Sequence, residues 1–340
     1  MQSHSSDPLH CESSRDAWQS TLIISTMKKL KHLVVTALAA FISLTSSQSA
    51  YASSAPLNIP NNCTLTTIHY ATHSDQQLLM DCYQASESAT SAPRPVYVYS
   101  FGGAWEFGSR EDGNMEKLIA ALTAENWVVC CIDYRLGVKM AKEAGTMTRE
   151  TWLDTYLGAI NMGTEDIYVA TRYLINHAEE LNIDTTKIVL AGSSAGAFNT
   201  LSAVYQQCNL TELFRKYLSP QFHYAGAISQ AGALWFAGEN TSLDWAQLPS
   251  PILFFHGSKD PLVTYDRTNR GLSGYGSVAI YSQLASEKSP ACFYDFEGLG
   301  HEVCVTPMHT HIPEIMRFLK QYVIQGEKRN EHIVIPKKKD

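Results

Sequence analysis

The sequence predicts an α/β protein with a doubly wound, mainly parallel sheet and helices on both faces. From about residue 57, short apolar runs rich in β-branched residues alternate with longer segments of helical period. The strand-like runs are apolar at nearly every position, as parallel strands buried on both faces require. No internal repeat, low-complexity linker or second composition regime interrupts the alternation, which favours a single domain.

Each expected element follows from its local composition. The segment 63–82 is a candidate hairpin, and helix 165–182 carries Ile167, Ala170 and Leu174 on one face. Apolar runs predict strands at 95–101, 127–136, 187–192, 223–232, 250–258 and 291–300, and the other helices are expected at 115–126, 195–208 and 312–326.

Two stretches, 137–163 and 209–221, do not fit the alternation. The first has the character of an insertion within the domain. In a parallel-sheet enzyme such excursions tend to lie over the carboxyl ends of the strands, where sites form. Either stretch is therefore a candidate wall of a binding pocket.

The composition excludes some classes of function. Hydrophobic residues make up 45% of the 340 residues and charged residues 17%, which is typical of a globular chain with a large core. The formal net charge is -7, and the two basic clusters lie near the chain ends. A nucleic-acid partner is therefore not expected.

Residues 27–52 have the pattern of a secretory signal peptide. A basic start at Met27 leads into the apolar run 33–44, and Ala50 and Ala52 form an A-x-A cleavage site. The apolar run is about a dozen residues long, which is too short to span a bilayer.

This pattern sets the expected domain organisation. Cleavage after Ala52 would leave a single domain at 53–340, secreted or periplasmic, with no stable membrane anchor. Residues 1–26 precede the expected natural start and are interpreted as an upstream segment.

Seven of the eight cysteines follow the expected cleavage point, and export would permit disulfides. Cys130 and Cys131 lie in an apolar run and are expected to be small core residues. No Cys/His spacing suggests a metal site, so no metal is expected. Two pairs are candidates for a disulfide: Cys63 with Cys82 across the hairpin and, more weakly, Cys292 with Cys304.

The segment "GSSAG" matches the motif G-x-S-x-G with Ser194 at its centre. An apolar strand enters it and a helix leaves it, which is the setting of a nucleophile elbow. The helix N-terminus would favour developing negative charge. Ser194 is therefore the candidate nucleophile, and the competing interpretation is a turn serine without catalysis. Ser193 is expected to be a packing residue.

A serine nucleophile needs a base and an acid, in the chain order Ser, Asp or Glu, His. Asp260 and His301 each follow a strand, and parallel strands collect such groups at their carboxyl ends. His301 would accept the proton of Ser194, and Asp260 would orient His301. The competing residues are His256, His309 and His311 for the base, and Asp266, Asp244 and the structural Asp133 for the acid.

An oxyanion hole is expected after the strand at 95–101. The Gly-Gly-Ala at 102–104 could aim backbone N–H groups at a tetrahedral intermediate, and the N–H of Ala195 would be a further donor.

These ordered motifs resemble the secreted esterases and lipases of the α/β-hydrolase fold, especially the carboxylesterases that carry an HGGG motif. The resemblance covers roughly 96–325 and includes "FGGAW", "IDYRLG", "NIDTTKIVLAGSSAGA", "HGSKD" and "GLGH". Members usually hydrolyse carboxylic esters of short acyl chains, including acetyl and feruloyl groups on plant polysaccharides. The resemblance implies the triad Ser194, Asp260 and His301 and the oxyanion donors Gly103, Ala104 and Ala195.

The sequence departs from this family pattern at two positions. Phe101 stands where the family has histidine, so any hydrogen bond from that histidine is absent. Ala104 replaces the third glycine, and alanine there is expected to require a negative φ. Trp105, Leu234 and Trp235 follow strand ends and are candidate pocket residues, with the hydrophobic core as the alternative.

The first functional hypothesis is a secreted serine esterase that acts through an acyl-enzyme on a small-molecule or glycan-linked ester, without a cofactor. The second is an α/β-hydrolase scaffold that binds a ligand and has lost hydrolysis, which the altered oxyanion loop motivates. A peptidase of the prolyl-oligopeptidase type is a third alternative, although the chain lacks room for the large accessory domain typical of that class.

Overall fold

The computed structural model describes residues 57–74, 76–87, 91–269 and 271–337. The expected signal peptide and the upstream segment lie outside these residues. The described residues fall within one compact unit, Ser49–Asp340. None of the described helices is both long enough and apolar enough to cross a bilayer.

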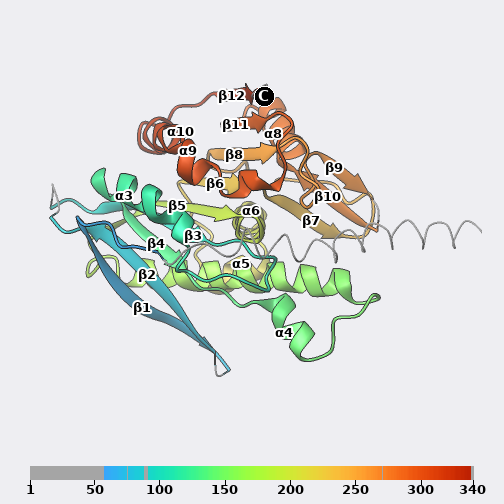
Figure 1. Ribbon diagram of the computed structural model, residues 1–340, viewed down its shortest axis with the longest axis horizontal. Helices are drawn as coiled ribbons and strands as arrows, with labels where there is room; N and C mark the ends of the chain where they lie inside the picture. The colour runs from blue at the N-terminus through green and yellow to red at the C-terminus, as the bar shows by residue number, and fades with distance from the viewer. Residues whose placement is uncertain (1–56, 75, 88–90, 270, 338–340) are drawn as a thin grey trace, which may run out of the picture. The chain divides into compact units, whose positions relative to one another are not determined.

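The described part of the chain contains a central sheet of nine strands, in the order β1-β2-β4-β3-β5-β6-β8-β11-β12 (Figure 1). β1 and β2 pair antiparallel, as do β2 and β4, and all the remaining pairs are parallel. The strands are β1 (Cys63–His73), β2 (Gln76–Ala85), β3 (Arg94–Ser100), β4 (Val128–Ile132), β5 (Ile183–Ser193), β6 (Gly226–Gln230), β8 (Ile252–Gly257), β11 (Ala291–Phe296) and β12 (Asn330–Ile335).

Helices pack against this sheet in two groups. Helices α5, α6 and α7 pack together, and α3, α9 and α10 form the second group. A smaller sheet, β7-β10-β9, adds to the fold. These elements are α3 (Glu116–Ala124), α4 (Gly137–Glu143), α5 (Trp152–Asn176), α6 (Ala195–Cys208), α7 (Glu212–Tyr217), β7 (Ala233–Ala237), β9 (Arg267–Asn269), β10 (Leu272–Gly276), α8 (Ser277–Ser286), α9 (Pro307–Thr310) and α10 (Ile312–Phe318).

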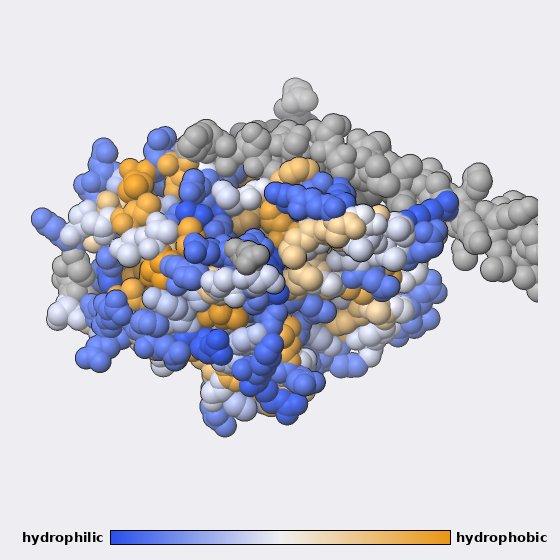
Figure 2. Space-filling model, turned by 90° about the horizontal axis from the view of Figure 1, so that it is seen from below, coloured by the Kyte–Doolittle hydropathy of each residue, from blue (hydrophilic) through white to orange (hydrophobic). Residues whose placement is uncertain are grey.

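The predicted fold class is confirmed: a mostly parallel sheet carries helices in the arrangement of an α/β-hydrolase. Every residue of β4, β6 and β8 is buried, as expected for central strands of a sheet covered on both faces. The sequence of β4 is apolar throughout, whereas β6 and β8 also bury Ser229, Gln230 and His256. On the face seen in Figure 2, hydrophobic and hydrophilic residues are interspersed.

The stretch 137–163 was predicted to be an insertion ahead of a helix, and the structure differs from that prediction. It contains α4 and the first half of α5, because the helix begins at Trp152 rather than near Asp166. Gly163 obscures this continuity in the sequence. A Cβ on Gly163 would lie 2.3 Å from Nδ2 of Asn199, so glycine permits the close approach of α5 and α6.

The proposed Cys63–Cys82 disulfide is wrong, because the hairpin register separates the two residues. Cys63 lies opposite Ala85, and its thiol is 3.0 Å from Oγ1 of Thr123. The Cys82 thiol instead lies 2.8 Å from the Cys130 thiol on β4. All the described cysteines are free, and Cys130 is buried as predicted.

The second candidate pair, Cys292 with Cys304, is also wrong. The Cys292 thiol lies on β11 beside Glu331 and Arg317, at 3.5 and 3.7 Å. Cys304 ends the short helical turn that begins at His301, and its thiol is free. Its carbonyl oxygen accepts a hydrogen bond from Ser193, which is described with the site.

Candidate active site

The backbone turns sharply at Ser194, between the end of β5 at Ser193 and the start of α6 at Ala195. Ser194 has φ 49° and ψ -116°, a conformation that serine rarely adopts. Its N–H donates to the Gln230 carbonyl at 2.9 Å. A Cβ on Gly196 would lie 1.9 Å from a backbone oxygen of β3, so only glycine fits there. The segment therefore has the geometry of a nucleophile elbow.

The structure brings the three predicted triad residues into one hydrogen-bonded line. Nε2 of His301 lies 2.9 Å from Oγ of Ser194, and Nδ1 of His301 lies 2.8 Å from Oδ2 of Asp260. Asp260 follows β8 and His301 follows β11, two adjacent parallel strands. The Asp260 side chain is fully buried, and that of His301 is 6% exposed. This arrangement can move a proton from the serine hydroxyl to the imidazole.

Both carboxylate oxygens of Asp260 have polar partners. Oδ1 accepts hydrogen bonds from the N–H groups of Leu262 and Val263, at 2.8 and 2.9 Å. Oδ2 faces His301 and, at 3.3 Å, Nε2 of His256. Burial by itself would raise the pKa of Asp260, but the hydrogen bonds from His256 and His301 outweigh burial and hold the pKa well below its usual range. The carboxylate is therefore ionised.

The pKa of His301 is shifted upward. Burial would lower it, but the neighbouring Cys304 side chain and the Asp260 carboxylate both raise it, with a net increase. The raised pKa makes the neutral imidazole a stronger base, and it also keeps His301 protonated to higher pH, so the form that can accept the serine proton increases as the pH rises.

The competing candidates lie outside this line, apart from His256. His309 is exposed and hydrogen-bonds to the Asn114 side chain at 3.0 Å. His311 is half-buried, and both Asp244 and Asp266 are exposed. Among the described residues, no group of three or more His, Cys, Asp or Glu side chains could hold a metal ion.

Ser193 does more than the packing role expected of it. It is buried, as predicted, but its Oγ also donates a hydrogen bond to the Cys304 carbonyl at 2.7 Å. This bond ties the nucleophile elbow to the segment that carries His301. The sequence contains no sign of the contact, because its partners are 111 positions apart.

The predicted oxyanion loop follows β3 and lies against the nucleophile. A Cβ on Gly102 would be 3.3 Å from Cβ of Ser194. Gly103 has φ 123° and Ala104 has φ 54°, so the expectation of a negative φ at Ala104 is wrong. Alanine in this left-handed region costs about 1–2 kcal/mol relative to right-handed backbone. The donor roles of Gly103, Ala104 and Ala195 stay predictions.

Neighbouring segments hold this strained loop in place. The Tyr134 hydroxyl donates to the Phe101 carbonyl at 2.9 Å, and the two rings stack at 4.3 Å. The carbonyl of Trp105 accepts from the N–H groups of Val138 and Lys139, both at 3.2 Å, where α4 begins. Phe101, which replaces the family histidine, therefore supports the loop by stacking.

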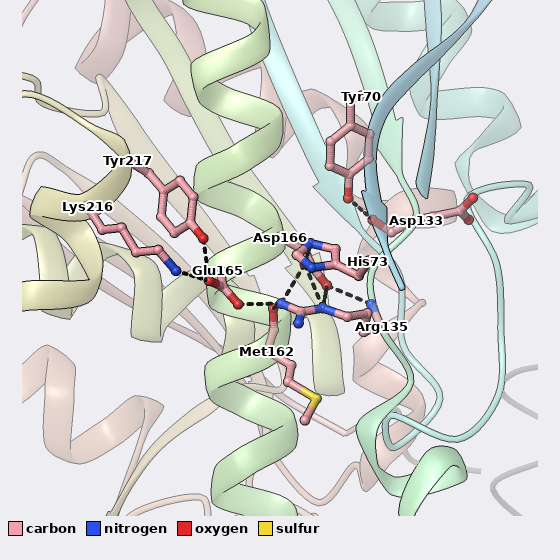
Figure 3. Close-up of polar contacts among 9 residues, drawn as sticks. All are labelled: Tyr70, His73, Asp133, Arg135, Met162, Glu165, Asp166, Lys216 and Tyr217. Atoms are coloured by element: carbon pink, nitrogen blue, oxygen red, sulfur yellow. Dashed lines mark hydrogen bonds and ion pairs between the residues drawn. The ribbon is translucent and has the colours of Figure 1, made fainter. Parts of the chain in front are cut away.

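The "IDYRLG" segment is anchored by a partly buried ionic cluster around the fully buried Asp166, shown in Figure 3. Arg135 donates its backbone N–H to Asp166 at 2.7 Å and its Nε–H at 2.9 Å. Nη2 of Arg135 contacts Glu165 at 2.6 Å, and His73 lies 3.3 Å from Asp166. This cluster fixes the residues that follow β4, Tyr134 among them.

Asp133, in the same segment, makes structural contacts. Its carboxylate lies 3.1 Å from Nη1 of Arg110 and accepts from the N–H of Leu79 at 3.3 Å. Its carbonyl accepts from the Tyr70 hydroxyl at 2.5 Å (Figure 3). These contacts agree with the structural role expected for Asp133.

Two of the three predicted pocket residues, Leu234 and Trp235, line a cavity of about 260 Å³. Phe198, whose N–H donates to the Ser194 carbonyl at 3.1 Å, lines it too. Trp105 is not among the lining residues; it is buried, packs on Phe198 at 5.5 Å and donates from Nε1 to Asn199 at 2.8 Å. The three triad residues do not line this cavity, and its lining residue nearest to Ser194 in the sequence is Phe198, four positions further on.

Comparison with known proteins gives consistent results. The model of the carboxylesterase family matches residues 45–220, more than half of the chain. A probable isoprenylcysteine α-carbonyl methylesterase of Arabidopsis thaliana is 27% identical over 128 residues, which cover 38% of this chain and 22% of that protein. The chain thus spans less than a quarter of that relative's length.

Solved esterases share the fold. Esterase B of Lactobacillus rhamnosis superposes with a TM-score of 0.55 at 15% identity, covering 88% of this chain and 97% of that one. A propionate-bound thermophilic esterase of Thermogutta terrifontis gives 0.54 at 18% identity, covering 77% and 94%.

Proposed function

Because the chain belongs to the carboxylesterase family, we propose that it is a serine esterase that hydrolyses carboxylic esters through an acyl-enzyme. The observation that carries this proposal is the hydrogen-bonded line from Ser194 through His301 to Asp260. In the first step His301 takes the hydroxyl proton, and Oγ of Ser194 attacks the ester carbonyl carbon.

The remaining steps use the same residues. The tetrahedral oxyanion accepts hydrogen bonds from backbone N–H groups of Gly103, Ala104 and Ala195. His301 returns its proton to the departing alcohol, which leaves an acyl group on Ser194. A water molecule, deprotonated by His301, then attacks the acyl carbon; as the bond to Oγ breaks, His301 returns this proton to Ser194 and the acid is released.

We infer short acyl groups, such as acetyl, as the preferred substrates, with feruloyl groups on glycans as a further candidate. A small cavity walled by Phe198, Leu234 and Trp235 supports this choice. The similar Thermogutta terrifontis esterase has been solved with propionate bound, which points in the same direction. The signal-like segment 27–52 supports action outside the cytoplasm, on extracellular or periplasmic esters.

The test compares hydrolysis of p-nitrophenyl acetate, butyrate and octanoate by the full chain and by Ser194→Ala. We expect kcat/KM to fall by roughly 10⁶-fold in Ser194→Ala, and the wild-type rate to decrease with acyl length. Ser289→Ala is the matched control and should retain activity, because this serine is buried just ahead of β11 and its Oγ donates to the Pro249 carbonyl, away from the triad and the cavity.

Equal rates in wild type and Ser194→Ala would contradict the proposal. In that case, absence of labelling by a fluorophosphonate probe would favour the binding scaffold, because such probes require an activated serine. Cleavage of peptide amides in preference to esters would favour a peptidase.

A further inference from the structure

A second histidine lies behind the candidate triad. His256 is the fifth residue of β8 and is fully buried. Its Nε2 lies 3.3 Å from Oδ2 of Asp260, the same oxygen that contacts His301. Its Nδ1 lies 2.8 Å from Oγ of Ser277, the buried first residue of α8. The contacts therefore continue from Ser194, His301 and Asp260 to His256 and Ser277.

Which nitrogen of each imidazole carries a proton follows from what its neighbours can donate or accept. An ionised carboxylate only accepts hydrogen bonds, so both imidazoles must direct an N–H toward Oδ2 of Asp260. For His256 that nitrogen is Nε2, which lies 3.3 Å from Oδ2 of Asp260. Its N–H is out of line for a full hydrogen bond in the described part of the chain, so the two groups interact mainly through their charges. Nδ1 of His256 then accepts the Ser277 hydroxyl proton, which holds the ring in one tautomer.

We propose that His256 is a positioning residue that, held by Ser277, shares the charge of Asp260 and limits how tightly that carboxylate binds protonated His301. The inference rests on the proposed esterase function. A carboxylate with two imidazole donors on one oxygen offers less charge to each donor. His301 can then release its proton to the leaving alcohol more easily than it could with Asp260 to itself.

Of the two carboxylates near His256, Asp260 is the one that contacts a ring nitrogen of His256. The ring of Tyr265 packs edge-on against His256, with centroids 5.5 Å apart. Asp295 lies opposite His256 on β11, but its carboxylate pairs with Tyr265 and with His332, the latter at 3.2 Å. On the other side of Asp260, His301 is contacted by Ser194 and Cys304.

The experiment compares His256→Phe, which keeps a ring without a donor, with His256→Gln, which keeps an N–H donor. The His301 titration is followed by NMR in the full chain, beside the acid limb of kcat/KM. We expect His256→Phe to move both midpoints upward by about 0.5 to 1 pH unit, because Asp260 then stabilises only the His301 cation. His256→Gln should shift them less.

Tyr265→Phe is the matched control, because it alters the same pocket without touching Asp260, and it should leave both midpoints in place. A His256→Phe protein with lower thermal stability and an unchanged His301 midpoint would overturn the proposal and leave His256 a packing role. If His256→Phe does not fold, Ser277→Ala replaces it: an upward shift of the His301 midpoint supports the proposal, and no shift overturns it.

The NMR titration does not depend on hydrolysis. A wild-type chain without Ser194-dependent esterase activity would contradict the proposed function. The titration of His301 would still decide whether His256 shares the charge of Asp260.

Discussion

Two carboxylates, Asp260 and Asp166, are equally buried, but their pKa values are shifted in opposite directions. Both side chains are fully buried and accept several hydrogen bonds. Asp260 is held by backbone N–H groups and two histidines, whereas Asp166 is held by Arg135 with His73 nearby. Burial raises the pKa of Asp166 more than Arg135 lowers it, while the pKa of Asp260 is lowered overall.

The two sites differ in whether the partner of the carboxylate can exchange a proton. A guanidinium stays protonated at every physiological pH, so Arg135 and Asp166 form a fixed link between the end of β4 and α5. An imidazole gains and loses a proton near neutral pH, so the charge beside Asp260 can change during a reaction. In the proposed mechanism the fixed site supports the reacting one, because it anchors the segment that carries Tyr134, whose hydroxyl donates to the predicted oxyanion loop.

The largest expected effect is on activity at the reacting site. Asp260→Asn removes the charge that stabilises the His301 cation and allows the wrong tautomer, so kcat/KM should fall by about 10⁴-fold. Ester hydrolysis and thermal unfolding should be measured on the same preparation, and the protein should still unfold cooperatively. Activity within tenfold of wild type would show that Asp260 does not differ from a structural carboxylate.

Asp166→Asn should show the converse, a loss of stability with little loss of activity. Asp166→Asn weakens the charged hydrogen bonds from Arg135 and leaves Glu165 as the carboxylate that contacts its guanidinium, at a cost of about 2 kcal/mol in the free energy of unfolding. Urea denaturation measures this, with Asp154→Asn on the exposed side of the same helix as the control. A loss of kcat/KM of a hundredfold or more in folded Asp166→Asn would remove the distinction between the two sites.

The smallest expected effect is at the connection between the two sites. Tyr134→Phe keeps the stacking on Phe101 but removes the hydroxyl that donates to its carbonyl. The lost hydrogen bond should cost about 1 kcal/mol, and a looser oxyanion loop should lower kcat roughly fivefold with KM nearly constant. A fall in stability with kcat unchanged would confine Tyr134 to the core and separate the two sites.

Residues that follow strands directly were predictable from the sequence. Asp260 and His301 come just after β8 and β11, and Ser194 just after β5. Because parallel strands end at one edge of the sheet, their order and spacing were enough to place them together. The central strands themselves are short apolar runs, whose local composition determines the element.

Contacts set by register and side-chain approach were not predictable in this way. The hairpin register puts Cys63 opposite Ala85, and a shift of three positions separates it from Cys82. The bond from Ser193 to the Cys304 carbonyl and the contact of His256 with Asp260 depend on tertiary packing. The early start of α5 was hidden by glycine at 163, which is needed where α5 approaches α6 closely.

The backbone of Ser194 bears on how the chain would change under selection. A non-glycine residue held in this region of φ and ψ costs about 1–3 kcal/mol of stability. In a lineage that no longer used the hydroxyl, glycine at position 194 would be the more stable choice. The demands of folding and of chemistry thus conflict at this single position, and a serine retained there in descendants would record continued use of the site.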